Sequence, residues 1–256
     1  MDSKTVPAVP ARVSLPTVLA WAIHAFTASG AVLAFLAWRA VQAGQFRLAL
    51  LYLGVALVVD GIDGTLARLA GVTERTPGID GATLDLVVDY LTYVFVPAIL
   101  IDRAGLIAPP YDTVAVAAIL LSSLYTFART DMKTQDNYFR GFPALWNAVA
   151  FYLVLLRPGP AASAIIVAMF AGLTFAPIHF VHPVRVSAHR PWLVAVTVLW
   201  GIASLMLLFA DWSPRWTKLW LALSLAGAAG LLAVGGLRTL RGRRHGTQSL
   251  PQATSR

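Results

Sequence analysis

Long apolar segments constrain this chain more than any other feature of its sequence. Hydrophobic residues make up 58% of the 256 positions, only 12% are charged, and the mean hydropathy is +0.70. A soluble domain of this length would need a much larger polar surface. Apolar runs of about eighteen residues or more recur, and each can cross the roughly 30 Å hydrocarbon core of a bilayer as a helix. The sequence therefore predicts an all-α, polytopic helical membrane protein.

We expect about eight transmembrane helices, at residues 15–38, 46–68, 82–102, 111–131, 143–157, 161–181, 192–210 and 216–237. Turn residues such as "APPYD" at 108–112 separate them. The span at 143–157 is short, so a six-span count is the alternative. One membrane domain would occupy residues 15–237, between an N-terminal segment, 1–14, and a basic, disordered tail, 238–256.

The distribution of Lys and Arg predicts how the chain is oriented. An even number of spans places both termini on one side of the membrane. That side carries fourteen of the 20 Lys and Arg residues, and the other side carries Arg39, Arg47, Arg103, Arg157, Arg215 and Lys218. The positive-inside rule then makes both termini cytoplasmic, and it accounts for the net charge of +8 without nucleic-acid binding. The absence of cysteine excludes disulfides and cysteine-based metal or redox chemistry.

Carboxylates are concentrated at the predicted cytoplasmic boundary, between the second and third spans. Asp60 and Asp63 share a helix face near the end of the second span, and Asp85 and Asp89 share one near the start of the third. The short connection makes these spans antiparallel neighbours, so the four carboxylates lie at similar depth. They would repel one another strongly at low dielectric unless hard cations such as Mg²⁺ or Mn²⁺ bind them.

Two other interpretations of the acidic residues are open. They could be interfacial caps paired with arginines, for example Asp63 with Arg68 or Asp80 with Arg75. Four acids in two face-sharing pairs argue against this, because intramembrane acids are costly and usually functional. They could also be the cation site of an ion-coupled transporter, which predicts polar residues or broken helices at mid-membrane.

Small residues beside the carboxylates favour phosphoryl transfer. Gly61, Gly64 and Gly81 remove side chains near the acids. A glycine inside a helix costs about 1 kcal/mol relative to alanine, so its use here indicates close approach of a ligand. Arg68 can neutralise phosphate charge. Two metals, an arginine, small residues and a spare carboxylate match the needs of phosphoryl transfer at a membrane surface.

As a pattern, residues 60–89 read D-G-I-D-G-x2-A-R-x12-G-x3-D-x3-D. This resembles the signature of the CDP-alcohol phosphotransferase family of integral membrane enzymes. Its fixed positions are matched by Asp60, Asp63, Gly64, Ala67, Arg68, Gly81, Asp85 and Asp89. The resemblance implies a six-helix core, here with two further helices, and two divalent cations held by the four aspartates. It also makes Asp89 the catalytic base, and assigns CDP binding to Gly64, Ala67, Arg68 and Gly81.

Further segments resemble the branch of that family that joins choline to CDP-diacylglycerol. They are "HAFTASG" at 24–30, "DGATLDLVVDYLTYVFVP" at 80–97 and "FRGFPALWNAVAFYLVLL" at 139–156. Relatives carry an Asn-x-x-Thr-like element near the nucleotide in the first segment, so His24 and Thr27 become further CDP contacts. The resemblance implies a bacterial inner-membrane enzyme with a cytoplasmic active site. Its partners would be CDP-diacylglycerol, choline and the bilayer, and a homodimer stays open.

Choline needs a binding site of its own. A quaternary ammonium has no hydrogen-bond donor, so aromatic faces are its usual partners. Tyr93 lies one helical turn beyond Asp89 on the same face, and Tyr90 and Trp146 are further candidates. The alternative is that these rings belong to the aromatic belt of a membrane protein.

Arginines and histidines in the connections between spans also have expected roles. Arg129 and Arg140 are expected to meet lipid phosphate, with topology and interface snorkelling as the alternative. The histidines of "HFVH", His179 and His182, are expected to be interfacial hydrogen-bonders rather than metal ligands.

Other substrates are the alternatives to choline and CDP-diacylglycerol. Serine, inositol phosphate or glycerol phosphate could replace choline, and CDP-choline with diacylglycerol could replace the substrate pair. An anionic acceptor would want basic residues beside Asp89, and the third span offers none around it.

Overall fold

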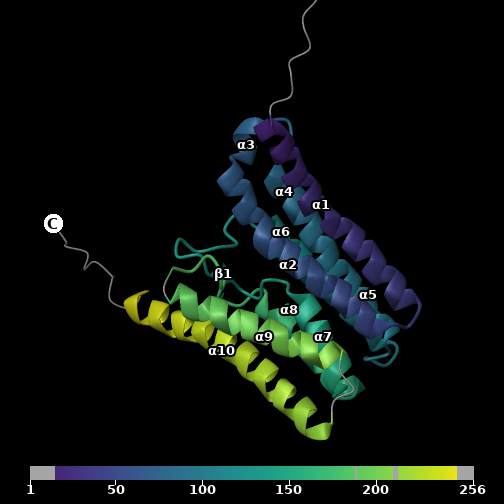
Figure 1. Ribbon diagram of the computed structural model, residues 1–256. Coiled ribbons are helices and arrows are strands. Elements are labelled where there is room, and N and C mark those ends of the chain that lie inside the picture. Colours follow the sequence, from purple (N-terminus) through teal and green to yellow (C-terminus); the bar gives the residue numbers. More distant parts are fainter. Residues whose placement is uncertain (1–14, 188, 210–212, 247–256) are drawn as a thin grey trace, which may run out of the picture.

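The structure is a computed structural model that describes residues 15–187, 189–209 and 213–246. Within these ranges most of the chain is helical, as Figure 1 shows. The predicted N-terminal segment, 1–14, and residues 247–256 of the predicted tail lie outside the described residues. The all-α, polytopic fold expected from the apolar runs is confirmed.

Six helices in the described residues are long and apolar enough to cross a membrane. They are α1 (Leu15–Gln42), α2 (Phe46–Ala70), the continuous helix Gly81–Arg103, α6 (Tyr111–Ala128), α9 (Arg190–Phe209) and α10 (Pro214–Gly246). The continuous helix consists of α4 (Gly81–Asp89), a π-helical segment η1 (Tyr90–Phe95) and α5 (Val96–Arg103). A single turn, α3 (Val72–Arg75), follows α2.

The two remaining apolar helices are shorter. They are α7 (Trp146–Leu156, 11 residues) and α8 (Pro160–Leu173, 14 residues). At 1.5 Å per residue they reach about 16 and 21 Å, less than the roughly 30 Å of a bilayer core. Each of the eight apolar segments expected from the sequence contains a helix in the described chain, but only six have the length of a full span. The predicted span at 161–181 is wrong at its end, because the helix stops at Leu173 and His179–Phe180 form a strand.

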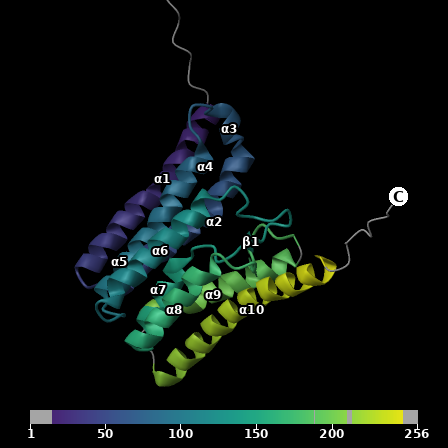
Figure 2. The ribbon, with the colours of Figure 1, turned by 180° about the vertical axis from the view of Figure 1, so that it is seen from behind.

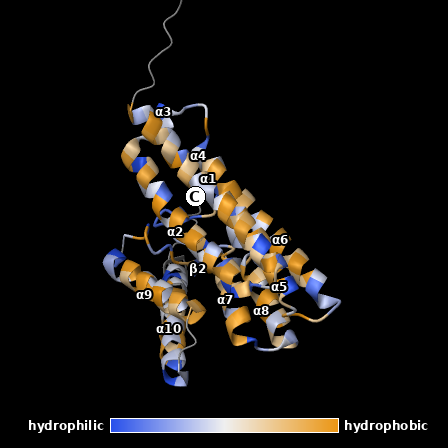
Figure 3. Cartoon of the chain, turned by 45° about the vertical axis from the view of Figure 1, so that its right-hand side comes forward, coloured by the Kyte–Doolittle hydropathy of each residue, from blue (hydrophilic) through white to orange (hydrophobic). Residues whose placement is uncertain are grey.

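The helices form two packed groups. In Figures 1 and 2, α1 runs along α2 beside α4 and α5, whereas α9 runs along α10. The core between α1 and α2 contains small residues, including Ala34, Ala37 and Ala49. Small residues let membrane helices approach closely. Large apolar side chains such as Phe35 (53% exposed) face outward, and Figure 3 shows that apolar residues recur along the long helices. A bilayer would cover these surfaces.

A two-stranded ribbon joins two distant connections. Strand β1 (Phe139–Arg140) follows α6, and strand β2 (His179–Phe180) follows α8. They pair antiparallel, with Phe139 opposite Phe180 and Arg140 opposite His179. The hairpin of α7 and α8 therefore returns the chain to the side from which it entered. Both connections belong to the Lys- and Arg-rich side predicted from the sequence.

The last helix extends further than the sequence predicts. The predicted boundary at residue 238 falls inside α10, which continues to Gly246. Tertiary contacts hold this part of the helix. Arg238 Nε donates to Asp136 Oδ2 over 2.6 Å, and Thr239 Oγ1 accepts a hydrogen bond of 2.8 Å from the backbone of His179. The other limits of the predicted domain stay predictions.

Candidate functional site

The C-terminal half of α2 and helix α4 bring three carboxylates together. Asp60, Asp85 and Asp89 each offer one oxygen, and these oxygens all lie within 4.8 Å of one another. All three residues are partly buried. Oxygen ligands of Mg²⁺ stand about 2.0–2.1 Å from the ion, so a set this compact fits one hard divalent cation. In the described residues this is the one group of three or more acids or histidines with such geometry.

Helix α4 begins where it does because Asp80 caps it. The Asp80 carboxylate accepts hydrogen bonds from the backbone of Ala82 (3.0 Å) and Thr83 (3.2 Å) and from the Thr83 hydroxyl (2.7 Å). These bonds, chiefly that from the Thr83 side chain, lower the pKa of Asp80. Asp80 is therefore a helix cap, as an N-terminal aspartate commonly is. The cap fixes where α4, the helix that carries Asp85 and Asp89, begins.

Asp63 occupies a different place from the other three aspartates. Its side chain is buried (4% exposed), and Thr27 lies close enough to hydrogen-bond with its carboxylate. Asp63 does not belong to the compact set of three oxygens, although Asp60 is within electrostatic range of it. All four aspartates thus lie at one end of the α2–α4 pair, and the metal roles predicted for them stay predictions.

A π-helical segment follows Asp89 directly and carries two of the predicted choline-binding residues. Tyr93, within this segment, donates a hydrogen bond of 2.6 Å to Asp60 Oδ2. Segments of π-helix are rare and frequent at functional sites. The sequence, interpreted as an α-helix, predicts only that Tyr93 shares a face with Asp89. The structure adds that the Tyr93 hydroxyl reaches Asp60 in the acidic cluster.

A cavity of about 690 Å³ opens beside the aspartates. Pockets for small ligands span roughly 300–1,000 Å³, so the volume fits a nucleotide. Five of the six residues predicted to bind CDP line it, namely His24, Thr27, Gly64, Ala67 and Gly81. The sixth, Arg68, is not among the lining residues, but its Nη1 lies 3.4 Å from the place that a Cβ on Gly64 would take. CDP binding by these residues stays a prediction.

Glycine matters differently at two points of the cavity. A Cβ on Gly81 would lie 3.2 Å from His24 Cε1, so glycine leaves room for the imidazole. The His24 ring is fixed by a hydrogen bond of 2.8 Å between its Nε2 and the Thr76 hydroxyl. A Cβ on Gly64 would meet only the flexible ends of arginine side chains. The α2 backbone is thus open to a ligand at Gly64.

Two basic residues near the aspartates come from distant connections. Arg185 follows β2 and lines the cavity, and Lys133 precedes β1 and lies within electrostatic range of Asp60, Asp85 and Asp89. Burial, followed by the charge of Arg185, lowers the pKa of Lys133. In the sequence Arg185 contributed only to the charge count that sets topology. No local pattern could have placed it at the site, because the contact depends on how the helices pack.

The predicted choline-binding rings are not equally close to the acids. Tyr93 is 5% exposed and bonded to Asp60. The other two make hydrogen bonds to α6: the Tyr90 hydroxyl donates to the Leu120 carbonyl oxygen (3.4 Å), and Trp146 Nε1 donates to Ser123 Oγ (2.8 Å). Trp146 has no exposed surface. Choline binding by any of the three stays a prediction.

The two arginines predicted to meet lipid phosphate share an acidic partner in their own loop. Arg129 Nε lies 2.9 Å and Arg140 Nη1 3.7 Å from Asp131 carboxylate oxygens. The guanidinium of Arg129 also lies over the Tyr125 ring, 5.4 Å from its centre. Lipid-phosphate binding by Arg129 and Arg140 stays a prediction.

The two histidines of the ribbon region make structural contacts. His179 bonds to Thr239, and the His182 ring stacks on Phe139 with 5.4 Å between ring centres. Burial and the nearby cations Lys133 and Arg185 lower the pKa of His182 to about 4, so its ring is neutral at pH 7. Neither histidine belongs to the metal-competent group found among the described residues.

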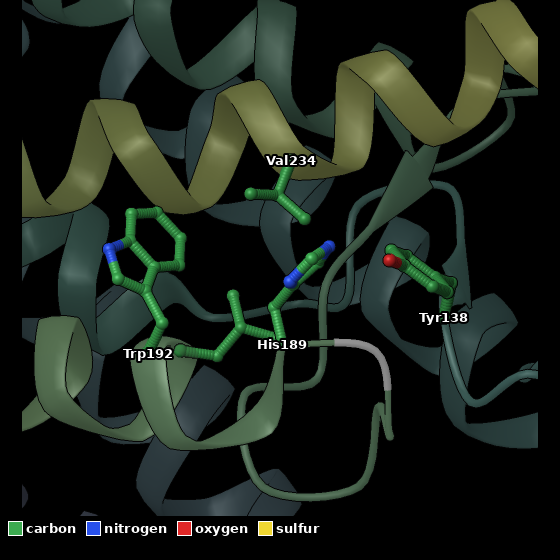
Figure 4. Close-up of a pocket in the computed structure, with 5 residues that line it drawn as sticks. Tyr138, His189, Trp192 and Val234 are labelled. Carbon is green, nitrogen blue, oxygen red and sulfur yellow. The ribbon is translucent and has the colours of Figure 1, made fainter.

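A second cavity, of about 380 Å³, lies between α9, α10 and the loop before β1. Figure 4 shows its lining residues, of which Tyr138, His189, Trp192 and Val234 are labelled. Leu193 completes the lining. This second cavity shares no lining residue with the cavity beside the aspartates.

The polytopic helical fold carries an aspartate cluster beside a nucleotide-sized cavity at one end of its spans, as the resemblance to the CDP-alcohol phosphotransferases leads one to expect. No family model matches the chain. The chain does match curated proteins. The chain is 46% identical over 207 residues to phosphatidylcholine synthase of Pseudomonas aeruginosa, covering 80% of this chain and 87% of that protein.

Other phosphatidylcholine synthases match over the same share of the chain. The one of Rhizobium meliloti is 40% identical over 206 residues, 80% of this chain and 86% of that protein. The one of Borreliella burgdorferi is 35% identical over 202 residues, 79% of this chain and 86% of that protein. The chain therefore belongs to the phosphatidylcholine synthase family, and it is an enzyme.

Proposed function

We propose that this protein transfers the phosphatidyl group of CDP-diacylglycerol to choline, which yields phosphatidylcholine and releases CMP. The observation that carries the proposal is 46% identity to a phosphatidylcholine synthase over 80% of the chain. The convergence of the signature residues at one cavity supports it independently, since Gly64, Gly81 and Asp85 come from two helices and line the same space.

The aspartates are suited to hold the divalent cations that such a reaction needs. Asp60, Asp85 and Asp89 provide a compact oxygen set for one ion. Asp63, buried beside Thr27, would complete the ligands of a second ion with Asp60. Bound Mg²⁺ or Mn²⁺ would neutralise diphosphate charge and stabilise the leaving phosphate.

The nucleotide is expected to lie in the cavity beside the aspartates. His24 and Thr27 would contact it from α1, Gly64 and Ala67 from α2, and Gly81 from the start of α4. The acyl chains of the donor would remain in the bilayer. Holding an amphipathic donor at a fixed depth makes the attack of a bound acceptor effectively intramolecular, which can lower the barrier substantially.

Asp89 is proposed as the general base. It would accept the proton of the choline hydroxyl while the choline oxygen bonds to the phosphorus attached to diacylglycerol. The bond between that phosphorus and the bridging oxygen then breaks, and the electron pair leaves on CMP. A base within reach of the attacking hydroxyl contributes about 10²–10⁴-fold. The ring of Tyr93, whose hydroxyl bonds to Asp60, would supply an aromatic face for the quaternary ammonium.

The orientation proposed is that of an inner-membrane enzyme with both termini and the active site in the cytoplasm. The Lys- and Arg-rich connections support this orientation, because positive loops remain on the cytoplasmic side. The ribbon and the aspartate end of α2 belong to that same group of connections.

Purified protein in vesicles, supplied with labelled choline, tests the proposal. Labelled phosphatidylcholine should form only when CDP-diacylglycerol and Mg²⁺ or Mn²⁺ are both present. Parallel reactions with serine, inositol phosphate or glycerol phosphate, and with CDP-choline plus diacylglycerol, test the other acceptors and the reversed substrate pair. Product in one of these reactions but not with choline would refute the proposal. Ion uptake by the vesicles that requires neither choline nor a CDP-linked substrate would support an ion-coupled transporter instead.

A further inference from the structure

Arg185 and Arg68 converge on one point of the cavity beside the aspartates. The place that a Cβ on Gly64 would take lies 3.4 Å from Arg68 Nη1 and 3.6 Å from Arg185 Nη2. Glycine leaves this point free of a side chain. The two guanidinium groups come from opposite halves of the sequence, and a phosphate group placed between them could accept hydrogen bonds from both.

Among the described residues, neither guanidinium forms an ion pair with a carboxylate. Arg68 donates a hydrogen bond of 3.1 Å to the uncharged Thr65 hydroxyl. In the described part of the chain, no carboxylate oxygen lies within ion-pairing distance of Arg185. Arg185 is instead within electrostatic range of Asp63 and Asp85 without pairing with them. Two unpaired cations around an open point are the arrangement that an anionic ligand completes.

The charges of the site point to a diphosphate. Four aspartates and two divalent cations would cancel, whereas the diphosphate diester of the proposed donor carries two negative charges. Arg68 and Arg185 supply two positive charges beside the nucleotide cavity. Lys133 does not line that cavity and lies near Asp60, Asp85 and Asp89 instead. Charge also builds on the CMP phosphate as the bond breaks, and a fixed guanidinium there would stabilise it.

The last helix, α10, supports the segment that carries Arg185. Val186, the next residue, is buried (1% exposed). The preceding strand β2 pairs with β1, and its His179 backbone donates to Thr239 of α10. A Cβ on Gly235 would overlap the His179 carbonyl oxygen, so glycine lets α10 pack directly under β2. The C-terminal helix thereby fixes the backbone from which Arg185 extends.

We infer that Arg185 is a substrate-binding residue that, together with Arg68, binds the diphosphate group of CDP-diacylglycerol, and that α10 positions it through β2. The inference rests on the proposed function and adds a residue that the aspartate signature does not contain. A loop residue from the second half of the chain would then complete a site otherwise built by α1, α2 and α4.

The test compares CMP with cytidine, which lacks the phosphate. Equilibrium affinities of the purified protein for both are measured at saturating Mg²⁺ for Arg185→Gln, Arg185→Lys and the control Arg190→Gln. Arg190 is exposed at the start of α9 and lines neither cavity. Arg185→Gln should weaken CMP binding about 10- to 100-fold, the range of a lost charged hydrogen bond, and leave cytidine binding unchanged. Arg185→Lys should lose less, and Arg190→Gln should match wild type.

The positioning role has its own variant. Gly235→Ala should reproduce the CMP-selective loss, because the added methyl must displace the His179 carbonyl and with it the segment after β2. Wild-type affinity for CMP in Gly235→Ala would refute the role of α10. CMP affinity unchanged in Arg185→Gln, or an equal loss for cytidine, would overturn the assignment of Arg185. If wild-type protein neither bound CMP nor made phosphatidylcholine, the proposed function would fail as well.

Discussion

The Tyr93 hydroxyl donates a hydrogen bond of 2.6 Å to Asp60 Oδ2, and this bond links the π-helical segment to α2. Because Tyr93 is 5% exposed, water does not readily replace it as a donor. The tyrosine therefore orients a carboxylate of the compact acidic set. Its ring lies beside that set, where the aromatic face would attract a quaternary ammonium.

Tyr93→Phe separates these two roles, since it keeps the ring and removes the hydroxyl. We expect kcat to fall about 5- to 10-fold, the effect of one hydrogen bond, with a higher requirement for Mg²⁺ and little change in the choline KM. Tyr93→Leu should raise the choline KM in addition. Steady-state kinetics over choline and Mg²⁺ concentrations measure both. A Tyr93→Phe enzyme with a changed choline KM and an unchanged metal requirement would contradict the orienting role.

Asp63→Asn and Asp85→Asn should each abolish turnover, because each removes the charge of a proposed metal ligand. Metal titrations should distinguish them, since Asp85 belongs to the compact set and Asp63 lies outside it. Asp102→Asn, in an exposed position at the far end of the same continuous helix as Asp85, is the control. Activity above about a tenth of wild type at saturating metal would argue against a two-cation site.

Asp89→Asn keeps the size of the side chain and loses its charge. It should lower kcat by about 10²–10⁴, as loss of a general base does. Binding of CDP-diacylglycerol should weaken less than in Asp60→Asn, where rate and binding should fall together. Lipid-binding assays and single-turnover rates for both variants measure this. Equal loss of binding in the two variants would make Asp89 a ligand only.

Arg68→Ala should raise the KM for CDP-diacylglycerol more than the KM for choline, because its guanidinium faces the open point beside Gly64. The loss of one charged contact corresponds to about 1.5–3 kcal/mol. The comparison of both KM values with Arg75→Ala provides the control, since Arg75 bonds to the Ala70 carbonyl. A defect confined to choline would rule out the nucleotide-side assignment.

The ion pair of Arg238 with Asp136 should hold the end of α10 in a pH-dependent way. The hydrogen bond from Arg238 lowers the pKa of Asp136 from 3.8 to about 2. A carboxyl with a depressed folded-state pKa contributes stability above its unfolded value and loses it as the pH falls toward the folded value. The contribution is therefore complete above about pH 4 and is lost near pH 2. Because both side chains are partly exposed, it amounts to at most about 1 kcal/mol.

Hydrogen exchange measures this anchoring. At pH 7, Asp136→Asn should speed exchange of the α10 amides after Gly235 several-fold, as expected for about 1 kcal/mol. The difference from wild type should shrink between about pH 4 and pH 2. Asp112→Asn, at a partly exposed position at the start of α6, should leave these amides unchanged. Equal exchange in wild type and Asp136→Asn at pH 7 would show that the pair does not hold the helix end.

Local properties of the chain determined the helices and the acidic site. Whether a segment can be a helix in a bilayer depends on the apolar content of about 20 consecutive residues, so the helices could be located without knowing their neighbours. The convergence of Asp60 with Asp85 and Asp89 followed from helical spacing and a short connection. The cavity residues His24 and Thr27 required a resemblance, because no spacing rule relates α1 to the other two helices.

Tertiary structure decided the features that depend on contacts between distant segments. Two-residue strands such as β1 and β2 have no periodicity to detect, and they form only because two connections meet on one side. Residues 238–246 are polar and basic, yet they are helical, and Asp136 and β2 contact this part of α10. Arg185 reaches the cavity for the same reason: its position is set by the packing of β2 on α10, which no stretch of sequence around it encodes.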